Sequence, residues 1–150
     1  MLLTPGSQIM PPHIVILLAD DLGYGSVGYH DDASRGLQTP TIDALARGGL
    51  RFSSLYAGPK CSPSRAALLS GRHPWRHAGW LTNTPEERAE GVDVRYTFLP
   101  EVLRAAGYST HMVGKWHLGF SRHGMTPGAR GFDSSLVSLG GSSRHWEHSI

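Results

Sequence analysis

The amino-acid sequence predicts an α/β domain built on a mainly parallel sheet, and three observations lead to this expectation. Residues 13–19 form a continuous apolar run rich in β-branched side chains, as expected of a strand buried on both faces of a parallel sheet. Residues typical of helix starts and stops bracket several later segments. Strand-like runs at 108–113 and 132–139 alternate with these helices, a pattern typical of layered α/β folds.

In the first third of the chain, residues 1–12 are expected to be an irregular lead-in and residues 20–38 a loop rich in Gly and Asp. A helix is predicted over residues 39–46, because a proline suits the first helical position and a pair of glycines follows. Residues 50–57 alternate enough in polarity to predict a second strand.

The next helix is predicted to follow the chain's single cysteine. Ser62 is a good N-cap, Pro63 suits the first turn, and Gly71 is a suitable residue to end the helix. Residues 73–97 lack periodicity and are expected to be irregular. A further helix is predicted over residues 99–106, again with a proline near its start and a glycine after its end.

Length and composition indicate one globular domain with few special partners. A chain of 150 residues with a formal net charge of +2 is large enough to bury a core. No Lys/Arg cluster with interleaved aromatic residues occurs, so we expect no nucleic-acid partner. The apolar run at residues 14–19 is too short to span a bilayer, and no basic stretch precedes it. We therefore predict no transmembrane segment and see no signal peptide, which leaves the compartment open.

Cys61 is the only cysteine, so it forms no intrachain disulfide and serves either packing or reactivity. The predicted helix begins just after it, and free backbone N–H groups at a helix N-terminus favour negative charge. Arg65 lies one turn further on, where a cation opposes the helix dipole, so a contact with the same anion is a better explanation than helix stability. The alternative is a small buried thiol beside a solvated arginine.

Two other pairs of residues are candidates for chemistry. Asp20 and Asp21 end the first predicted strand, and their carboxylates converge on a hard cation such as Ca²⁺ only if the strand breaks there. Lys115 and His117 share one face if their segment is extended, with Trp116 turned into the packing. The alternatives are a solvated Asp-Asp turn, a solvated lysine and a structural histidine.

Three motifs give the chain a resemblance to a known family. The run C-S-P-S-R-A-A-L-L-S-G-R from Cys61 resembles the type I sulfatase signature C-x-P-S-R-x-x-x-L-x-G-R. Residues 13–25 resemble the first strand and metal loop of that family, and residues 114–119 (G-K-W-H-L-G) resemble its third motif. The Gly-Phe-Asp triplet at 131–133 is similar to the arylsulfatase B-like branch. The resemblance covers residues 13–150 and implies the N-terminal portion of a catalytic domain with an alkaline-phosphatase-like, three-layer α/β/α fold.

The resemblance also implies a chemistry. In type I sulfatases the motif cysteine is converted to formylglycine by a formylglycine-generating enzyme, and the aldehyde hydrates to a gem-diol that attacks sulfur. One Ca²⁺ ion and the arginine activate the gem-diol, the lysine contacts sulfate, and the histidine accepts a proton. The implied site residues are catalytic Cys61, Arg65 and His117, substrate-binding Lys115, and metal-binding Asp20, Asp21 and Cys61.

The resulting hypothesis is an arylsulfatase-type sulfuric ester hydrolase that acts on an aryl or carbohydrate sulfate ester. Two alternatives remain: an inert product that keeps only the first half of the fold, and a phosphoester or phosphonate ester hydrolase of the same superfamily. Related sulfatases are lysosomal, secreted or periplasmic. His73 and His77 are expected to be solvated because Pro74 interrupts them, whereas His145 and His148 are placed near the substrate entrance by the resemblance.

Overall fold

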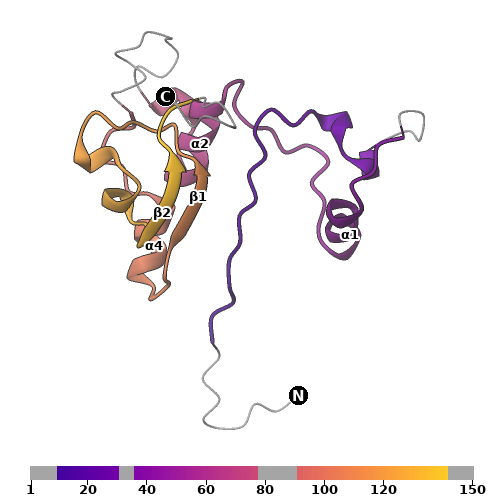
Figure 1. Cartoon of the computed structure of the whole chain (residues 1–150), viewed down its shortest axis with the longest axis horizontal. Helices are drawn as coiled ribbons and strands as arrows, with labels where there is room; N and C mark the ends of the chain where they lie inside the picture. Colours follow the sequence, from indigo (N-terminus) through magenta and orange to yellow (C-terminus); the bar gives the residue numbers. More distant parts are fainter. Residues whose placement is uncertain (1–9, 31–35, 78–90, 142–150) are drawn as a thin grey trace. The chain divides into compact units, whose positions relative to one another are not determined.

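The computed structural model describes residues 10–30, 36–77 and 91–141. The chain divides into two compact units, Met1–Leu50 and Arg51–Ile150. Figure 1 shows the elements of both units in sequence colours. In the described residues no helix is both long and apolar enough to cross a membrane.

The first unit is organised around helix α1 (Pro40–Gly48), which confirms the helix predicted over residues 39–46. Two 3₁₀ turns, Tyr24–Ser26 and Gly28–His30, precede it. The carboxylate of Asp43 accepts hydrogen bonds from the backbone N–H of Tyr29 (3.0 Å) and the hydroxyl of Thr39 (2.8 Å). Asp43 therefore ties the second 3₁₀ turn to the first turn of α1.

Two strands predicted from apolar patterns are absent from the structure. Residues 13–19 form no strand, and Val15 and Leu17 are 78% and 83% exposed. Residues 50–57 contain a turn instead of a strand, with Tyr56 88% exposed. Both predictions were wrong for the same reason. A strand exists only through hydrogen bonds to a neighbouring strand, and in the described part of the chain such pairing joins only β1 and β2.

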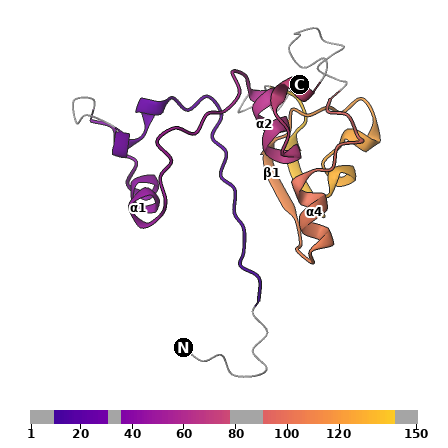
Figure 2. The ribbon, with the colours of Figure 1, turned by 180° about the vertical axis from the view of Figure 1, so that it is seen from behind.

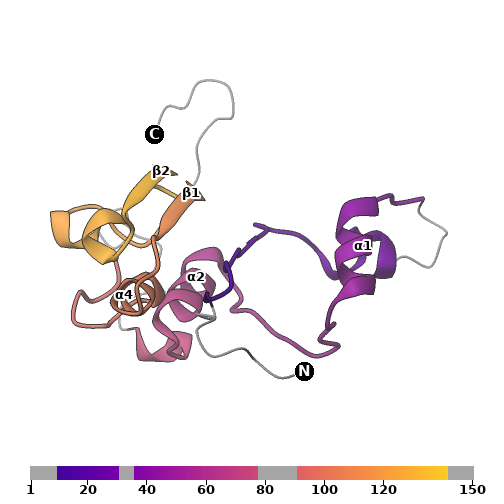
Figure 3. The ribbon, with the colours of Figure 1, turned by 90° about the horizontal axis from the view of Figure 1, so that it is seen from below.

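The second unit holds a parallel strand pair with helices beside it. Strands β1 (His111–Lys115) and β2 (Ser134–Ser138) pair in register from His111↔Ser134 to Lys115↔Ser138. Helices α2 (Cys61–Ser70) and α4 (Leu99–Ala105) lie on the same side of this pair, as Figure 3 shows. Figure 2 shows the two helices from behind, next to β1. The expected alternation of helices and strands is therefore present here as a small parallel sheet.

The helix and strand bounds refine the sequence predictions. Helix α2 begins at Cys61 with Lys60 as its N-cap, so the choice of Ser62 as N-cap was wrong. Gly71 ends α2 in the left-handed conformation (φ 64°), as predicted. Strand β1 starts later than predicted, because the N–H of Tyr108 still bonds to the carbonyl of Leu103 and closes the end of α4.

The core of the second unit lies between the helices and one face of the strand pair. Its fully buried members come from α2 and from the loops, including the one that follows β1: Ala66, Val92, Phe98, Trp116 and Leu118. The ring of Trp116 lies 6.1 Å from that of Phe98 and 6.3 Å from that of Phe132, centroid to centroid. On the other face of the strand pair, Val113 and Leu136 are paired in register and are 79% and 77% exposed.

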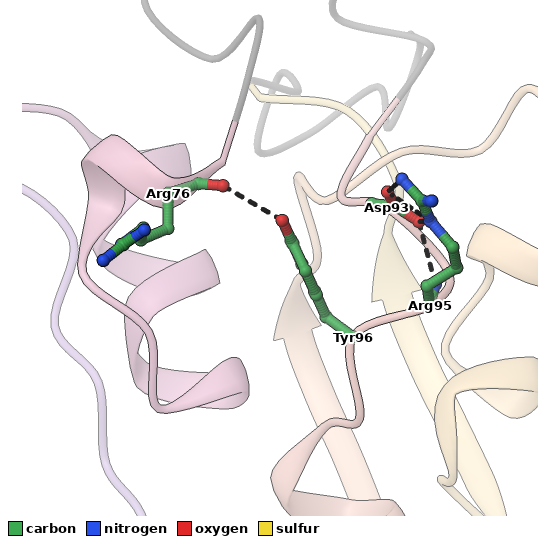
Figure 4. Close-up of polar contacts among 4 residues, drawn as sticks. All are labelled: Arg76, Asp93, Arg95 and Tyr96. Atoms are coloured by element: carbon green, nitrogen blue, oxygen red, sulfur yellow. Dashed lines mark hydrogen bonds and ion pairs between the residues drawn. The ribbon is translucent and has the colours of Figure 1, made fainter.

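Polar contacts fasten the segment before α4 to its neighbours. The hydroxyl of Tyr96 donates to the carbonyl of Arg76 (3.1 Å), which ties this segment to the 3₁₀ turn Pro74–Arg76 after α2 (Figure 4). In the same view, Arg95 bonds both carboxylate oxygens of Asp93 and lowers the pKa of that carboxyl to about 2. The guanidinium of Arg130 stacks 3.7 Å over the ring of Phe98 and donates to the carbonyl of Tyr96.

Candidate active site around Cys61 and His117

The thiol of Cys61 contacts the imidazole of His117. The Sγ atom lies 3.3 Å from Nδ1 of the ring, although the residues are 56 positions apart in the sequence. Cys61 is the first residue of α2, and His117 follows β1 by two residues. Both side chains are half-buried, so the pair stays open to solvent on one side. The structure therefore brings together two of the three residues predicted to be catalytic.

The backbone at His117 turns out of the strand. Its φ of 56° is left-handed, which is uncommon for a residue other than glycine. The N–H groups of Trp116 and His117 bond to the carbonyls of Ser138 (2.8 Å) and Leu139 (3.1 Å), which hold this turn beside the end of β2. The extended backbone on which the shared face of Lys115 and His117 depended is therefore absent at His117. The predicted packing of Trp116 is confirmed, since its side chain is fully buried.

The indole of Trp116 is what anchors this turn. Its Nε1 donates to the carbonyls of Gly119 (2.9 Å) and Met125 (3.1 Å) inside the core. A buried indole N–H needs a hydrogen-bond acceptor. The ring therefore has one orientation in which it packs in the core and its N–H is also hydrogen-bonded. The neighbouring His117 is thereby directed away from the core and toward α2.

Arg65 is buried, and it does not lie in solvent as the alternative interpretation supposed. Its residue exposure is 8%, and Nη1 donates to the main-chain carbonyl of Lys115 (2.5 Å). Four of the residues predicted to form the site, Cys61, Arg65, Lys115 and His117, thus come from the start of α2 and the end of β1. Open α/β sheets bind ligands at the loops that follow the carboxyl ends of their parallel strands.

Ser62, which the sequence indicated only as a helix cap, also contacts the imidazole of His117. Its Oγ lies 3.0 Å from Nδ1 of the ring. On the other side, a Cβ added to Gly141 would lie 2.5 Å from both Cε1 and Nε2 of the ring. The position of Ser62 next to the only cysteine was a usable signal, whereas nothing local in the sequence connects Gly141 to the site.

Asp20 and Asp21 belong to the first unit and are exposed. The backbone break that their convergence requires is present, because Asp21 has a left-handed φ of 56°. Carboxylate oxygens are the donors that Ca²⁺ prefers, but the ion takes about six to eight of them. In residues 10–30, 36–77 and 91–141, no group of three or more His, Cys, Asp and Glu side chains gathers. The donors fit Ca²⁺ in kind, and a complete shell requires further ligands.

The other histidines behave differently from one another. His73 is exposed, as expected, but His77 is buried with 4% exposure, so the expectation of a solvated side chain was wrong there. Its Nε2 contacts the hydroxyl of Ser70 (3.1 Å), and its ring packs edge-on against Tyr96. Burial lowers the pKa of His77, because the charged form loses solvation. His145 and His148 lie outside the described residues.

The Gly-Phe-Asp triplet at 131–133 has a structural role. The carboxylate of Asp133 accepts from the backbone N–H of Thr110 (2.8 Å) and lies 3.1 Å from Nε of Arg104. The hydrogen bond from Thr110 lowers the pKa of Asp133 most, with Arg104 contributing. These contacts join the loop before β1 to the residue before β2, so the triplet sets the pairing of the two strands.

Comparison with known proteins agrees with the motifs. The family model described as "Sulfatase" matches residues 12–150. The N-acetylgalactosamine-6-sulfatase of Rattus norvegicus is 47% identical over 131 residues, which are 82% of this chain and 24% of that protein. The arylsulfatase A of Homo sapiens is 46% identical over 131 residues, 84% of this chain and 25% of that protein. The chain thus spans about a quarter of the length of these curated relatives.

A solved structure, that of the protein Ps i-CgsB, is similar with a TM-score of 0.76 and 40% sequence identity. It is matched over 85% of this chain and 28% of its own. A second structure of Ps i-CgsB, in complex with k-i-k-neocarrahexaose, gives a TM-score of 0.74 at 39% identity. Because the family model extends over nearly all of the sequence, the chain belongs to the sulfatase family.

Proposed function

We propose that this chain carries the nucleophile and its surrounding residues for a sulfuric ester hydrolase. The observation that carries the proposal is the 3.3 Å contact between Cys61 Sγ and His117 Nδ1 within a chain of the sulfatase family. Nucleophile and base within hydrogen-bond reach of one another are the usual signature of covalent catalysis. The family resemblance further supports conversion of Cys61 to formylglycine by a formylglycine-generating enzyme.

The roles of the residues follow from their positions. When formed, the hydrated aldehyde at position 61 supplies an attacking oxygen and a second hydroxyl for the release of sulfate. His117 presents Nδ1 to position 61, so this ring nitrogen is the atom that takes a proton from there. Lys115 is a point charge suited to the dispersed negative charge of a sulfate group. Arg65, in α2, donates a hydrogen bond to the backbone of Lys115 and adds positive charge near the N-terminal end of the helix.

The proposal includes one Ca²⁺ ion with Asp20 and Asp21 among its ligands. The ion, when bound, supplies a Lewis acid that lowers the pKa of a coordinated hydroxyl. Support comes from the paired carboxylates and from the left-handed backbone at Asp21, which lets two adjacent side chains point to the same side of the chain. The carboxylates themselves contribute charge and oxygen donors, and both are exposed.

We also propose a carbohydrate sulfate ester as the substrate, ahead of a simple aryl sulfate. One relative carries N-acetylgalactosamine in its name, and Ps i-CgsB was solved with a hexasaccharide. The half-buried, solvent-open position of Cys61 and His117 suits a large substrate. The arylsulfatase B-like branch stays a finer prediction within this proposal.

The complete alkaline-phosphatase-like, three-layer fold is part of the same proposal. Residues 13–150 would form its N-terminal portion, with residues 1–12 as a lead-in. Support comes from the strand pair, which has helices on one side and the exposed Val113 and Leu136 on the other. Parallel sheets are normally covered on both faces, so these apolar side chains are suited to contact a further layer.

The decisive experiment is coexpression with a formylglycine-generating enzyme, followed by mass spectrometry of the tryptic peptide that contains Cys61. The purified chain is then assayed with a generic aryl sulfate and a sulfated oligosaccharide, each with Ca²⁺ and with chelator. We expect conversion at Cys61, with turnover that Ca²⁺ supports and Cys61→Ala abolishes. An unmodified thiol under these conditions would contradict the proposal.

The two alternatives predict different outcomes in the same assay. A catalytically inert product predicts no turnover even where Cys61 is fully converted, and the partial coverage of the relatives is the observation that favours it. A phosphoester or phosphonate ester hydrolase predicts faster turnover of the matched phosphate ester than of the sulfate ester. Parallel assays with both esters therefore separate the three functions.

A further inference from the structure

We propose that Ser62 is a positioning residue for His117, with Gly141 as its steric counterpart on the other side of the ring. The hydroxyl of Ser62 holds Nδ1 of His117 toward position 61. Because Gly141 has no Cβ, its backbone leaves room for the opposite edge of the ring. The catalytic meaning of this arrangement rests on the proposed function, whereas the orientation and tautomer of the ring do not.

The contacts around the imidazole define its orientation from two sides. Nδ1 lies 3.0 Å from Ser62 Oγ and 3.3 Å from Cys61 Sγ, so both side chains of the first turn of α2 meet the same ring nitrogen. Between these two, the hydroxyl is the stronger hydrogen-bonding group, since a thiol is a weak donor and a weak acceptor. Ser62 therefore contributes more than Cys61 to holding Nδ1 in place.

The opposite edge of the ring is held by close packing. A Cβ on residue 141 would come within 2.5 Å of Cε1 and Nε2, a distance at which the ring must shift. The side chain of His117 also starts from a left-handed backbone that is fixed by the hydrogen bond from its N–H to Leu139 (3.1 Å). The ring thus has little freedom to rotate away from α2 without losing its contact with Ser62.

The helix end determines which nitrogen carries the proton. Free N–H groups of the first turn of α2 create a positive potential near Ser62. That potential attracts the hydroxyl oxygen and turns its hydrogen outward, toward the ring. It also disfavours a ring N–H aimed at the helix end. The hydroxyl of Ser62 consequently donates to Nδ1, and the neutral ring carries its proton on Nε2.

This arrangement is compatible with proton transfer at position 61. A hydroxyl is both a donor and an acceptor, so Ser62 rotates its O–H once Nδ1 has taken a proton and then accepts from it. Ser62 therefore keeps the ring in one place through both protonation states. Loss of the hydroxyl is expected to slow turnover and to leave substrate binding nearly unchanged, because the contact is made to the base and not to the substrate.

The first test measures the ring itself and needs no activity. Long-range proton–nitrogen NMR of the unmodified chain reports the His117 tautomer, with the signal assigned by comparison with His117→Gln. We expect the Nε2–H tautomer in the wild type and in Ser62→Thr, and a mixture of tautomers in Ser62→Ala. Gly141→Ala is expected to shift the ring signals. Ser64→Ala is the matched control, because its hydroxyl bonds to the carbonyls of Gly58 and Lys60 and not to His117.

The second test measures kinetics on the converted chain. Ser62→Ala is expected to lower kcat by about 10- to 100-fold with KM nearly unchanged, and Ser62→Thr to restore it. A Ser62→Ala ring with the wild-type tautomer, or with an unchanged kcat, would overturn the positioning role. If the tautomer depends on Ser62 but no variant shows turnover, the positioning inference holds and the proposed function fails.

Discussion

The guanidinium of Arg65 and the main-chain carbonyl of Lys115 are joined by a hydrogen bond of 2.5 Å. This contact links the second turn of α2 to the last residue of β1 across 50 positions of sequence. It gives a structural reason for a cation close to the N-terminal end of a helix, where the dipole disfavours positive charge. Arg65 therefore has a structural partner in addition to any anion that it meets in the proposed reaction.

Replacing Arg65 by methionine tests this structural contribution. The carbonyl of Lys115 loses its buried donor, and an unsatisfied buried polar group costs about 1–3 kcal/mol. We expect the free energy of unfolding to fall by that amount in urea titrations of the unmodified chain. Arg65→Lys keeps the positive charge but not the planar guanidinium, so we expect an intermediate fall in the free energy of unfolding. Wild-type stability in Arg65→Met would show that the hydrogen bond contributes nothing.

The buried His77 predicts a pH-dependent stability. Burial lowers its pKa below the ordinary value of 6.5, so the unfolded chain binds a proton at a higher pH than the folded chain does. Stability is full above pH 6.5 and falls as the pH drops from 6.5 toward the folded value. We expect His77→Gln to flatten the pH dependence of the unfolding free energy between pH 7.5 and 5.5. The exposed His73 gives the control: His73→Gln should keep the wild-type slope, and an equal slope in both variants would exclude His77 as the cause.

Asp133 predicts a second pH effect, of the same sign as that of His77 but in a more acidic range. Its pKa is lowered below 3.8, chiefly by the hydrogen bond from the backbone of Thr110, so its contribution is present above pH 3.8 and is lost as the pH falls through the folded value. Asp133→Asn should lower the Tm at pH 7 and weaken the acid dependence below pH 4. Thermal melts followed by circular dichroism measure both. A Tm that is unchanged at pH 7 would mean that the carboxylate does not hold the strand pair in register.

The backbone of Gly91 lies so close to the backbone near Leu118 that there is no room for a side chain at this position. Its φ is 59°, and an added Cβ would lie 2.2 Å from the carbonyl oxygen of Leu118. We expect Gly91→Ala to cost about 2–5 kcal/mol, from left-handed strain and overpacking together. Gly107→Ala is the matched control, because Gly107 is also left-handed (φ 87°) with open space around it. Equal losses in the two variants, measured by urea unfolding, would show that the close approach carries no cost.

Local signals predicted the helices well. Proline at the start and glycine at the end located α1 and α4 within a few residues, and Gly71 ended α2 where expected. These signals work because capping and stop preferences act between residues close in sequence. The buried Trp116 was also predicted locally, because its side chain alternates with those of Lys115 and His117 along the chain.

Strands and side-chain partners were harder to predict. Residues 13–19 have the composition of a strand but no strand partner in the described part of the chain, and burial of His77 depends on Ser70 and Tyr96, which no periodicity connects to it. Whether residues 115–117 are extended was likewise not decided by local sequence, because long-range hydrogen bonds from Trp116 and His117 to the end of β2 impose a turn.

By itself, the order of residues determined the family, the motif that holds Cys61 and the identity of the side chains available for chemistry. These are properties of residue type and spacing along the chain. Only the tertiary structure decided that Ser62 and Cys61 share one nitrogen of His117 and that Gly141 lies against the same ring. Such contacts join residues far apart in sequence, and their geometry depends on how α2, β1 and β2 pack.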